Sequence, residues 1–296
     1  MSPSVEMLRA PELLPGMVQR YRGEPMPADD MRVEDAREAP DAIRDAHTVV
    51  DEHIAGVHCT WVNPEHRSNG LIVSLHGGGY IVGPGAAHWG WFSTLCRETG
   101  QAGLLIRYSR APEATYPTAL NEVLGVVRTL DCPWQLVGDS AGGGLGLATA
   151  FSLRDAGEAL PTALVLSSPW LDITMAHPEQ SANAHIDPMM GIPALDHYAK
   201  AYAGETDRTH PHLSPLYGDP TGLPPMLITV GTAELFLFET RDWKAKCDAA
   251  GTACEVIEVD GAIHDFAIML SLMPEAREVL PAQVEFLRGQ RLPPSG

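Results

Sequence analysis

The stretch WQLVGDSAGGGLGLATAFSL, residues 134–153, is the most informative part of this sequence. An apolar run typical of a buried strand ends at Gly138, and an Ala-, Leu- and Gly-rich run typical of a helix follows Ser140. Ser140 is therefore the centre of a G-x-S-x-G turn between strand and helix, the signature of a nucleophile elbow. Only small residues at Gly138 and Gly142 avoid clashes in so tight a turn. The pattern predicts a nucleophilic Ser140, with the backbone N–H of Ala141 directed at a developing oxyanion.

A second motif, LIVSLHGGGYIVG at residues 71–83, joins an apolar strand pattern to a run of three glycines. Consecutive glycines allow backbone N–H groups to converge on one point without side chains in between, as an oxyanion requires. A phosphate-binding loop is the alternative, but it would require Lys and Ser or Thr after the glycines, and neither follows here. We expect Gly78 and Gly79 to donate to the oxyanion, and His76 and Gly77 to support the loop.

Short apolar runs alternate with helical patterns over most of the chain. This alternation predicts an α/β fold with a mostly parallel central sheet flanked by helices. Trp243, Cys247 and Ala250 have the spacing of one helix face that packs on the sheet. The expected strands are residues 56–62, 71–75, 102–108, 134–138, 163–167, 226–230 and 254–259.

Two stretches depart from this alternation. Residues 1–45 are rich in Pro, Met and acidic side chains, and residues 172–222 are polar and interrupted by Pro and Gly. A loop of about fifty residues without secondary structure is unusual in a compact domain, so we expect the second stretch to contain short helices and to cover the core as a lid. The predicted organisation is an N-terminal cap segment (1–45), a catalytic core (46–171 and 223–296) and a cap insertion (172–222).

Composition restricts the classes of partner. The chain has 296 residues, of which 45% are hydrophobic, and a formal net charge of −18 at pH 7. This sign opposes binding to nucleic acid or to a membrane surface, so neither is expected as a partner. The five cysteines are scattered and form no C-x-x-C, which indicates free thiols in a reducing compartment. No export signal or membrane-spanning run is evident, and we expect a cytoplasmic protein.

The segment YSRAPEATYPTAL, residues 108–120, lies between the two glycine motifs. With HGGG at residues 76–79 and GDSAG at residues 138–142, it resembles the bacterial hormone-sensitive-lipase-like branch of the α/β-hydrolases. The resemblance extends from about residue 50 to the C-terminus, and the first 45 residues match loosely. It implies an α/β-hydrolase fold with a helical cap, a Ser–acid–His triad, and cleavage of carboxylic esters without a metal or cofactor. Many relatives pair through the last helix and strand, which allows for a homodimer.

This resemblance also implies where the remaining triad residues lie. The family has its acid after the sixth or seventh strand and its histidine after the last one. His264 follows the predicted strand at residues 254–259 and a Gly turn, and is the expected base. Glu234 occupies the position where many relatives have Asp, and is the expected acid.

Neighbouring ionisable residues are interpreted as structural. We expect Glu239 and Asp242 to be solvated charges on the helix after Glu234. Asp139 is expected to belong to the elbow and to point away from the reaction. Asp265 is interpreted as a local loop anchor, and His88 as one of several surface histidines.

These observations predict a serine carboxylesterase that acts through an acyl-enzyme on a small-molecule ester. The apolar residues of the cap segments favour short to medium acyl chains, with lactones as a further substrate class. Two alternatives stay open: an amidase or peptidase on the same fold, and a non-catalytic small-molecule receptor derived from a hydrolase. The apolar cap residues are Met7, Leu8, Leu13, Leu14, Met17, Met189, Met190 and Ile192.

Overall fold

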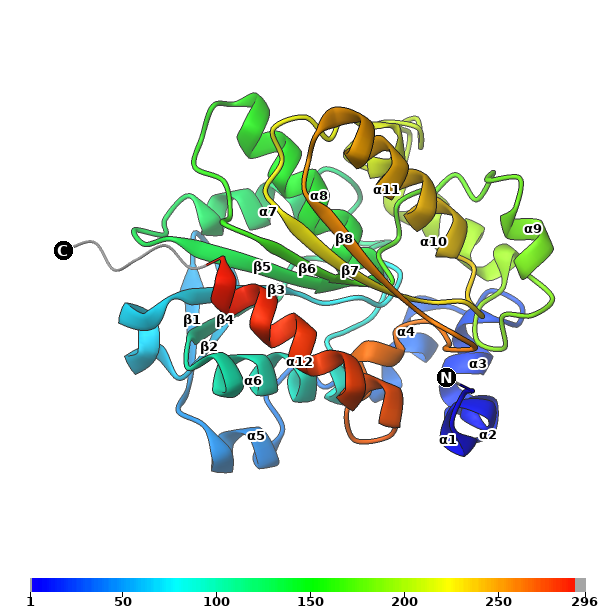
Figure 1. The fold of residues 1–296 in the computed structure, drawn as a ribbon, viewed down its shortest axis with the longest axis horizontal. Helices are drawn as coiled ribbons and strands as arrows, with labels where there is room; N and C mark the ends of the chain where they lie inside the picture. The colour runs from blue at the N-terminus through cyan, green and yellow to red at the C-terminus, as the bar shows by residue number, and fades with distance from the viewer. Residues whose placement is uncertain (1, 291–296) are drawn as a thin grey trace.

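The computed structural model describes residues 2–290, so the first residue of the predicted cap segment and the last six of the predicted core lie outside the described residues. Within this range, eight strands form one sheet: β1 (Val49–Ile54), β2 (Val57–Val62), β3 (Leu71–Leu75), β4 (Ala102–Ile106), β5 (Trp134–Asp139), β6 (Leu164–Ser167), β7 (Met226–Gly231) and β8 (Cys254–Val259). Their order is β1-β2-β4-β3-β5-β6-β7-β8 (Figure 1). β2 is antiparallel to both β1 and β4, and all other neighbouring strands are parallel.

This sheet confirms the predicted fold class, and each of the seven predicted strands is present. The strand that was not predicted is β1, which contains no continuous apolar run. It lies at the sheet edge, and its side chains are exposed or half-buried, including Asp51, Glu52 and His53. A strand that is paired on one side and solvated on its faces needs no continuous hydrophobic pattern.

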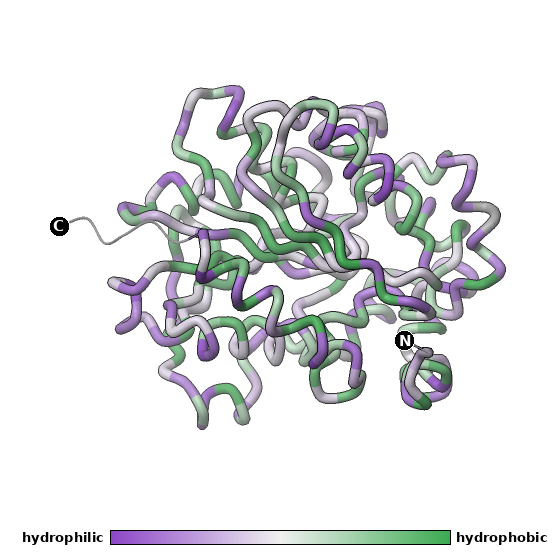
Figure 2. The backbone as a smooth tube through the Cα atoms, viewed as in Figure 1, coloured by the Kyte–Doolittle hydropathy of each residue, from purple (hydrophilic) through white to green (hydrophobic). Residues whose placement is uncertain are grey.

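Helices cover both faces of the sheet and explain why β3 to β7 are buried along their whole length. α6 (Ala86–Thr99) and α12 (Pro274–Gly289) lie on one face (Figure 1). α7 (Thr118–Val127), α8 (Ser140–Asp155) and α11 (Leu237–Ala250) lie on the other. Figure 2 shows that hydrophobic residues concentrate in the strands between these two layers.

The two stretches outside the βαβ pattern consist of short helices and loops. The N-terminal stretch contains α1 (Val5–Leu8), α2 (Ala10–Leu13), α3 (Pro15–Tyr21), α4 (Ala28–Met31) and α5 (Asp41–Ala46). The later stretch contains α9 (Gln180–Asn183) and α10 (Ile192–Ala203). α3 and α10 contact each other, since the rings of Tyr21 and Tyr198 meet edge to face with centroids 6.1 Å apart. Short 3-10 helices occur at Arg32–Glu34, Pro64–Asn69, Pro215–Tyr217 and Phe266–Ile268.

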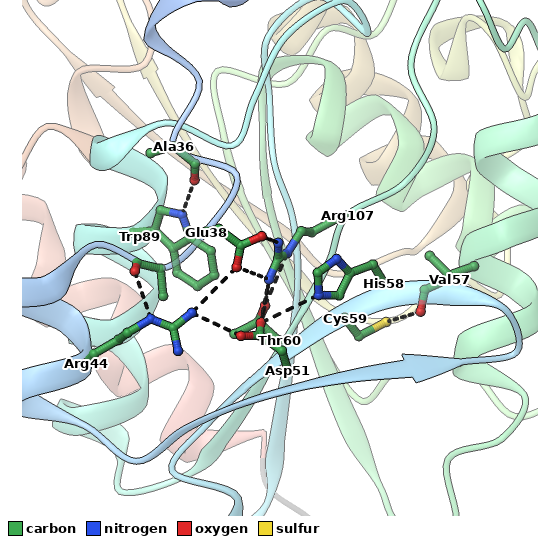
Figure 3. Close-up of polar contacts among 11 residues, drawn as sticks. Ala36, Glu38, Arg44, Asp51, Val57, His58, Cys59, Thr60, Trp89 and Arg107 are labelled. Carbon is green, nitrogen blue, oxygen red and sulfur yellow. Dashed lines mark hydrogen bonds and ion pairs between the residues drawn. The ribbon is translucent and has the colours of Figure 1, made fainter.

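A buried arginine ties the N-terminal stretch to the sheet (Figure 3). Arg107 follows β4, and its side chain is 1% exposed. Its guanidinium donates to Glu38, to Asp51 on β1 and to Thr60 on β2. Because three separate segments share one buried cation, the segment around Glu38 is held against the sheet edge.

The structure also bears on the state of the cysteines and on membrane-spanning helices. All five cysteines are free thiols. Of the helices within residues 2–290, none is both long enough and apolar enough to cross a membrane.

Candidate active site

Ser140 lies in a strained turn between β5 and α8. Its φ is +47°, a left-handed conformation that is unusual for a residue with a side chain. The turn requires its glycines: a Cβ on Gly142 would lie 2.1 Å from the carbonyl oxygen of Leu75, and one on Gly138 would lie 2.7 Å from that of Gly142. The sharp turn brings the hydroxyl to the carboxyl end of the sheet, where it lines the cavity described below.

His264 lies in the loop after β8, and its ring reaches Ser140. Nε2 of His264 is 3.1 Å from Oγ of Ser140, within hydrogen-bond distance. The ring is 2% exposed and packs edge to face on Phe236, with centroids 4.9 Å apart. The fold thus brings together two side chains that are 124 residues apart in the sequence.

Glu234 follows β7 and lies on the opposite side of the His264 ring. Its Oε2 is 3.8 Å from Nδ1 of His264, an ion-pair distance but longer than a hydrogen bond. The same Oε2 accepts a hydrogen bond of 2.8 Å from Ser168 Oγ. Burial raises the pKa of Glu234 to about 8, although the nearby imidazole acts in the opposite direction. Within the described residues, neither Glu234 Oε1 nor His264 Nδ1 has a hydrogen-bond partner.

The glycine run after β3 faces the same point. Gly78 and Gly79 have φ of +114° and +62°, and a Cβ on Gly78 would lie 2.4 Å from the carbonyl oxygen of Val82. Among residues 2–290, the N–H groups of Gly78 and Gly79 have no acceptor, and both residues line the cavity beside Ser140. Ala141 stands in the first turn of α8, where backbone N–H groups have no intrahelical acceptor.

His76 and Gly77 lie beneath this loop, away from the reacting atoms. The His76 ring is buried and stacks on Tyr108, with centroids 4.3 Å apart. Its Nδ1 is 2.8 Å from the carbonyl oxygen of Gly77, and Tyr108 donates its hydroxyl proton to the carbonyl of His76. Burial lowers the pKa of His76 to about 3, so the ring is neutral at pH 7. The Gly77 N–H donates to Asp139 at 3.0 Å and faces away from the oxyanion position.

Ser140 and His264 line a cavity of about 480 Å³. Both stretches of short helices contribute apolar side chains to its wall, among them Leu13, Leu14, Met17 and Met190. These four belong to the predicted set of apolar cap residues. The other four do not line the cavity: Met7 and Met189 are buried elsewhere, Leu8 is exposed, and Ile192 is half-buried.

Known proteins resemble this chain in sequence and in fold. A family model described as alpha/beta hydrolase fold matches residues 72–268. An acetyl-hydrolase of Streptomyces hygroscopicus is 35% identical over 239 residues, which cover 78% of this chain and 80% of the relative. A crystal structure of an esterase from the bacterial hormone-sensitive lipase family has a TM-score of 0.84 and 30% identity, and the match covers 98% of this chain and 99% of the other. The chain belongs to the bacterial hormone-sensitive-lipase-like family of α/β-hydrolases.

The name of a further relative of this hydrolase also indicates ester hydrolysis. Esterase LipU of Mycobacterium tuberculosis is 31% identical over 247 residues, covering 78% of this chain and 82% of that protein. The predicted family and fold are confirmed, and the protein is a carboxylic ester hydrolase.

The structure of this hydrolase contradicts one interpretation of its sequence. Glu239 was expected to be solvated, but its side chain is fully buried. It accepts hydrogen bonds from Leu171 N at 2.7 Å and from Gln180 Nε2 at 2.9 Å, and burial raises its pKa. The signal was present, because Glu239 precedes Trp243 by four residues and therefore lies on the same buried helix face. Asp242, by contrast, is exposed as expected.

Two further residues line the cavity beside Ser140 in this hydrolase and were interpreted otherwise from the sequence. His88 on α6 is no surface residue, since it lines the cavity and its Nε2 is 3.1 Å from Asp139 Oδ2. Burial opposes protonation of His88, but the charge of Asp139 and the hydrogen bonds of the His88 ring together raise its pKa. Asp265 is more than a loop anchor, because its Oδ2 lies 3.1 Å from His264 Nε2. No motif joins these residues in the sequence, and only the fold brings them together.

Proposed function

We propose that the hydrolase is a serine carboxylesterase with a Ser140–His264–Glu234 triad. The observation that carries this proposal is the 3.1 Å separation between His264 Nε2 and Ser140 Oγ at the floor of the cavity. The oxyanion hole of this proposal consists of the N–H groups of Gly78, Gly79 and Ala141.

The reaction proceeds in two steps. Ser140 attacks the ester carbonyl while His264 accepts its proton, and the glycine N–H groups stabilise the oxyanion. His264 then protonates the leaving alcohol, which leaves an acyl group on Ser140. A water molecule activated by the same imidazole releases the acid and restores the enzyme. Glu234 orients the ring and stabilises its charged form, which requires Glu234 to be ionised.

We also propose that residues 1–45 and 172–222 act as the two parts of a cap over the core formed by residues 46–171 and 223–296. In support, both parts contribute apolar side chains to the cavity wall. The cavity volume of about 480 Å³ suits a small ester better than a long triglyceride. Short to medium acyl chains are therefore the proposed substrates, with lactones as a cyclic subset.

A substrate panel tests this function. Purified protein is assayed with p-nitrophenyl esters from acetate to palmitate, with a lactone and with an anilide. We expect turnover to be highest for short to medium esters and negligible for the anilide. Ser140→Ala removes the activity, whereas the matched control Ser152→Ala keeps it, because Ser152 lies three turns further along α8 and donates to the carbonyl of Ala148. An active Ser140→Ala protein would refute the mechanism, and preferred anilide cleavage would favour an amidase.

The edge strand β8 supports a further proposal, a homodimer formed through β8 and α12. Among residues 2–290, β8 has a neighbouring strand on one side only, which leaves backbone groups free to pair. Light scattering coupled to gel filtration should then give twice the chain mass of 31.9 kDa. A single-chain mass at micromolar concentration would refute the dimer.

A further inference from the structure

Asp265 lies between the proposed base and the elbow. It adopts a left-handed conformation with φ +57°, and it lines the same cavity as Ser140. Its Oδ2 is 3.1 Å from Nε2 of His264, the same nitrogen that lies 3.1 Å from Ser140 Oγ. The side chain is 9% exposed and lines the substrate cavity. A carboxyl at this position must affect the base directly.

The charge of this carboxyl follows from its neighbours. The carboxyl of Asp265 neighbours that of Asp139, and its Oδ1 is buried without a hydrogen-bond partner among the described residues. Two adjacent buried carboxyls share one proton rather than ionise together. Asp139 accepts from Gly77 N at 3.0 Å and lies 3.1 Å from His88 Nε2, so two donors already face its oxygens and the shared proton is assigned to Asp265. Burial, followed by the charge of Asp139, raises the pKa of Asp265 well above its usual range.

The other titratable groups near Asp265 are consistent with this assignment. Glu234 and Tyr21, on the far sides of the His264 ring and of the cavity, add no positive charge at pH 7. His88, when protonated, is a cation that lies against Asp139, and Arg20 lines the same cavity from α3. Asp265 is therefore the neutral member of the pair.

A neutral carboxyl beside Nε2 suits a general base. An ionised Asp265 would hold a proton on His264 and so leave Ser140 without an acceptor for its own proton. A neutral Asp265 leaves the lone pair of Nε2 free in the resting enzyme.

We propose that Asp265 is a positioning residue that acts as a neutral carboxylic acid. Its O–H donates to Asp139 and so connects the His264 loop to Gly77 and the oxyanion loop. Its second oxygen accepts the Nε2–H of the imidazolium that forms when Ser140 attacks, until that proton passes to the leaving alcohol. This inference rests on the proposed esterase mechanism.

Two substitutions separate this role from a charged one. In Asp265→Asn the amide N–H donates to Asp139 and the amide oxygen accepts from His264, so kcat for p-nitrophenyl butyrate should stay within about threefold of wild type. Asp265→Leu removes both hydrogen bonds, and kcat should fall by about 10- to 100-fold while KM stays within about twofold. Asp260→Leu is the matched control, because Asp260 is an exposed carboxyl in the same loop, and it should leave kcat unchanged.

The pH profile of kcat/KM gives an independent readout. If Asp265 is neutral, kcat/KM falls at the same acidic pH in wild type and in Asp265→Asn, so the acidic limbs of the two profiles coincide. If Asp265 is charged, removal of a charge 3.1 Å from His264 shifts that limb toward lower pH by about one unit or more, which would overturn the proposal. Equal kcat values for the Asn and Leu variants, whether high or low, would overturn it as well.

Folding and the underlying function are controlled separately. Thermal unfolding verifies each variant, and if Asp265→Leu does not fold, the Asn variant and its acidic limb decide alone. Failure of the triad appears differently, as an active Ser140→Ala protein or an inactive wild type.

Discussion

Replacement of Glu234 by Gln should make the enzyme nearly inactive and at the same time more stable. The substitution keeps the size of the side chain and leaves an oxygen for the Ser168 hydroxyl, which donates to Glu234 at 2.8 Å. It removes the charge that stabilises the imidazolium of His264. Loss of the acid charge from a Ser–His–acid triad lowers kcat by up to about 10⁴, and we expect about 10² to 10⁴ here because the Glu234–His264 distance is 3.8 Å.

The stability gain follows from the pKa of Glu234. This pKa is raised from 4.5 to about 8 in the folded protein, so the carboxyl contributes stability below pH 4.5 that is lost as the pH rises through 8. Integrated over this range, the wild type loses about 4 kcal/mol more than the Gln variant between pH 5 and pH 9. For a chain of 296 residues, this difference means that the Tm of the Gln variant rises by about 6 °C relative to the Tm of the wild type between pH 5 and pH 9.

The assay combines urea and thermal unfolding at pH 5, 7 and 9 with kcat for p-nitrophenyl butyrate. Glu239→Gln is the matched control, because Glu239 is equally buried with a raised pKa but bonds to Leu171 and Gln180 rather than to His264. It should show a pH-dependent stability gain and keep its activity. A Glu234→Gln variant that keeps kcat within about threefold, or whose stability gain is the same at all three pH values, would refute this reasoning.

Three other substitutions test the loop, the cavity and the sheet edge. Gly78→Ala should lower kcat by about 10² to 10³, because its Cβ would lie 2.4 Å from the carbonyl of Val82 and displace an oxyanion donor; an unchanged kcat would contradict the oxyanion role. Leu14→Trp should lower kcat/KM for p-nitrophenyl octanoate about tenfold more than for the acetate, since Leu14 lines the cavity; equal effects on both esters would place the acyl chain elsewhere. Arg107→Ala should lower the free energy of unfolding by about 2 kcal/mol because it leaves its hydrogen-bond partners unsatisfied, whereas Arg97→Ala, which breaks an exposed ion pair, should change it by less than about 0.5 kcal/mol.

The sequence predicts the parallel core of this fold because buried parallel strands are continuous apolar runs. It predicts the nucleophile turn because the G-x-S-x-G pattern between strand and helix is itself local, although the contact that requires Gly142 is with Leu75 on β3. β1 escapes prediction because its exposed side chains carry no apolar pattern. These successes and the failure depend on local sequence alone.

Contacts between distant elements are harder to predict. Asp139, His88 and Asp265 come from β5, α6 and the loop after β8, and no spacing rule links them. Glu239 is different, because its position four residues before Trp243 placed it on the buried face. Glu239 was interpreted as solvated because glutamate is usually charged, although its helical spacing predicted burial. A buried carboxylate of this kind is recognised only when its donors, Leu171 N and Gln180 Nε2, are known.

The most direct test of the central claim is the site of covalent modification by a fluorophosphonate. Wild type and Ser140→Ala are treated with the reagent, and the adduct is located by mass spectrometry of the intact chain and its peptides. We predict one adduct per chain, on the peptide that contains Ser140, with loss of esterase activity in proportion to labelling. An adduct on another residue, or full activity after complete labelling of Ser140, would contradict the proposed nucleophile.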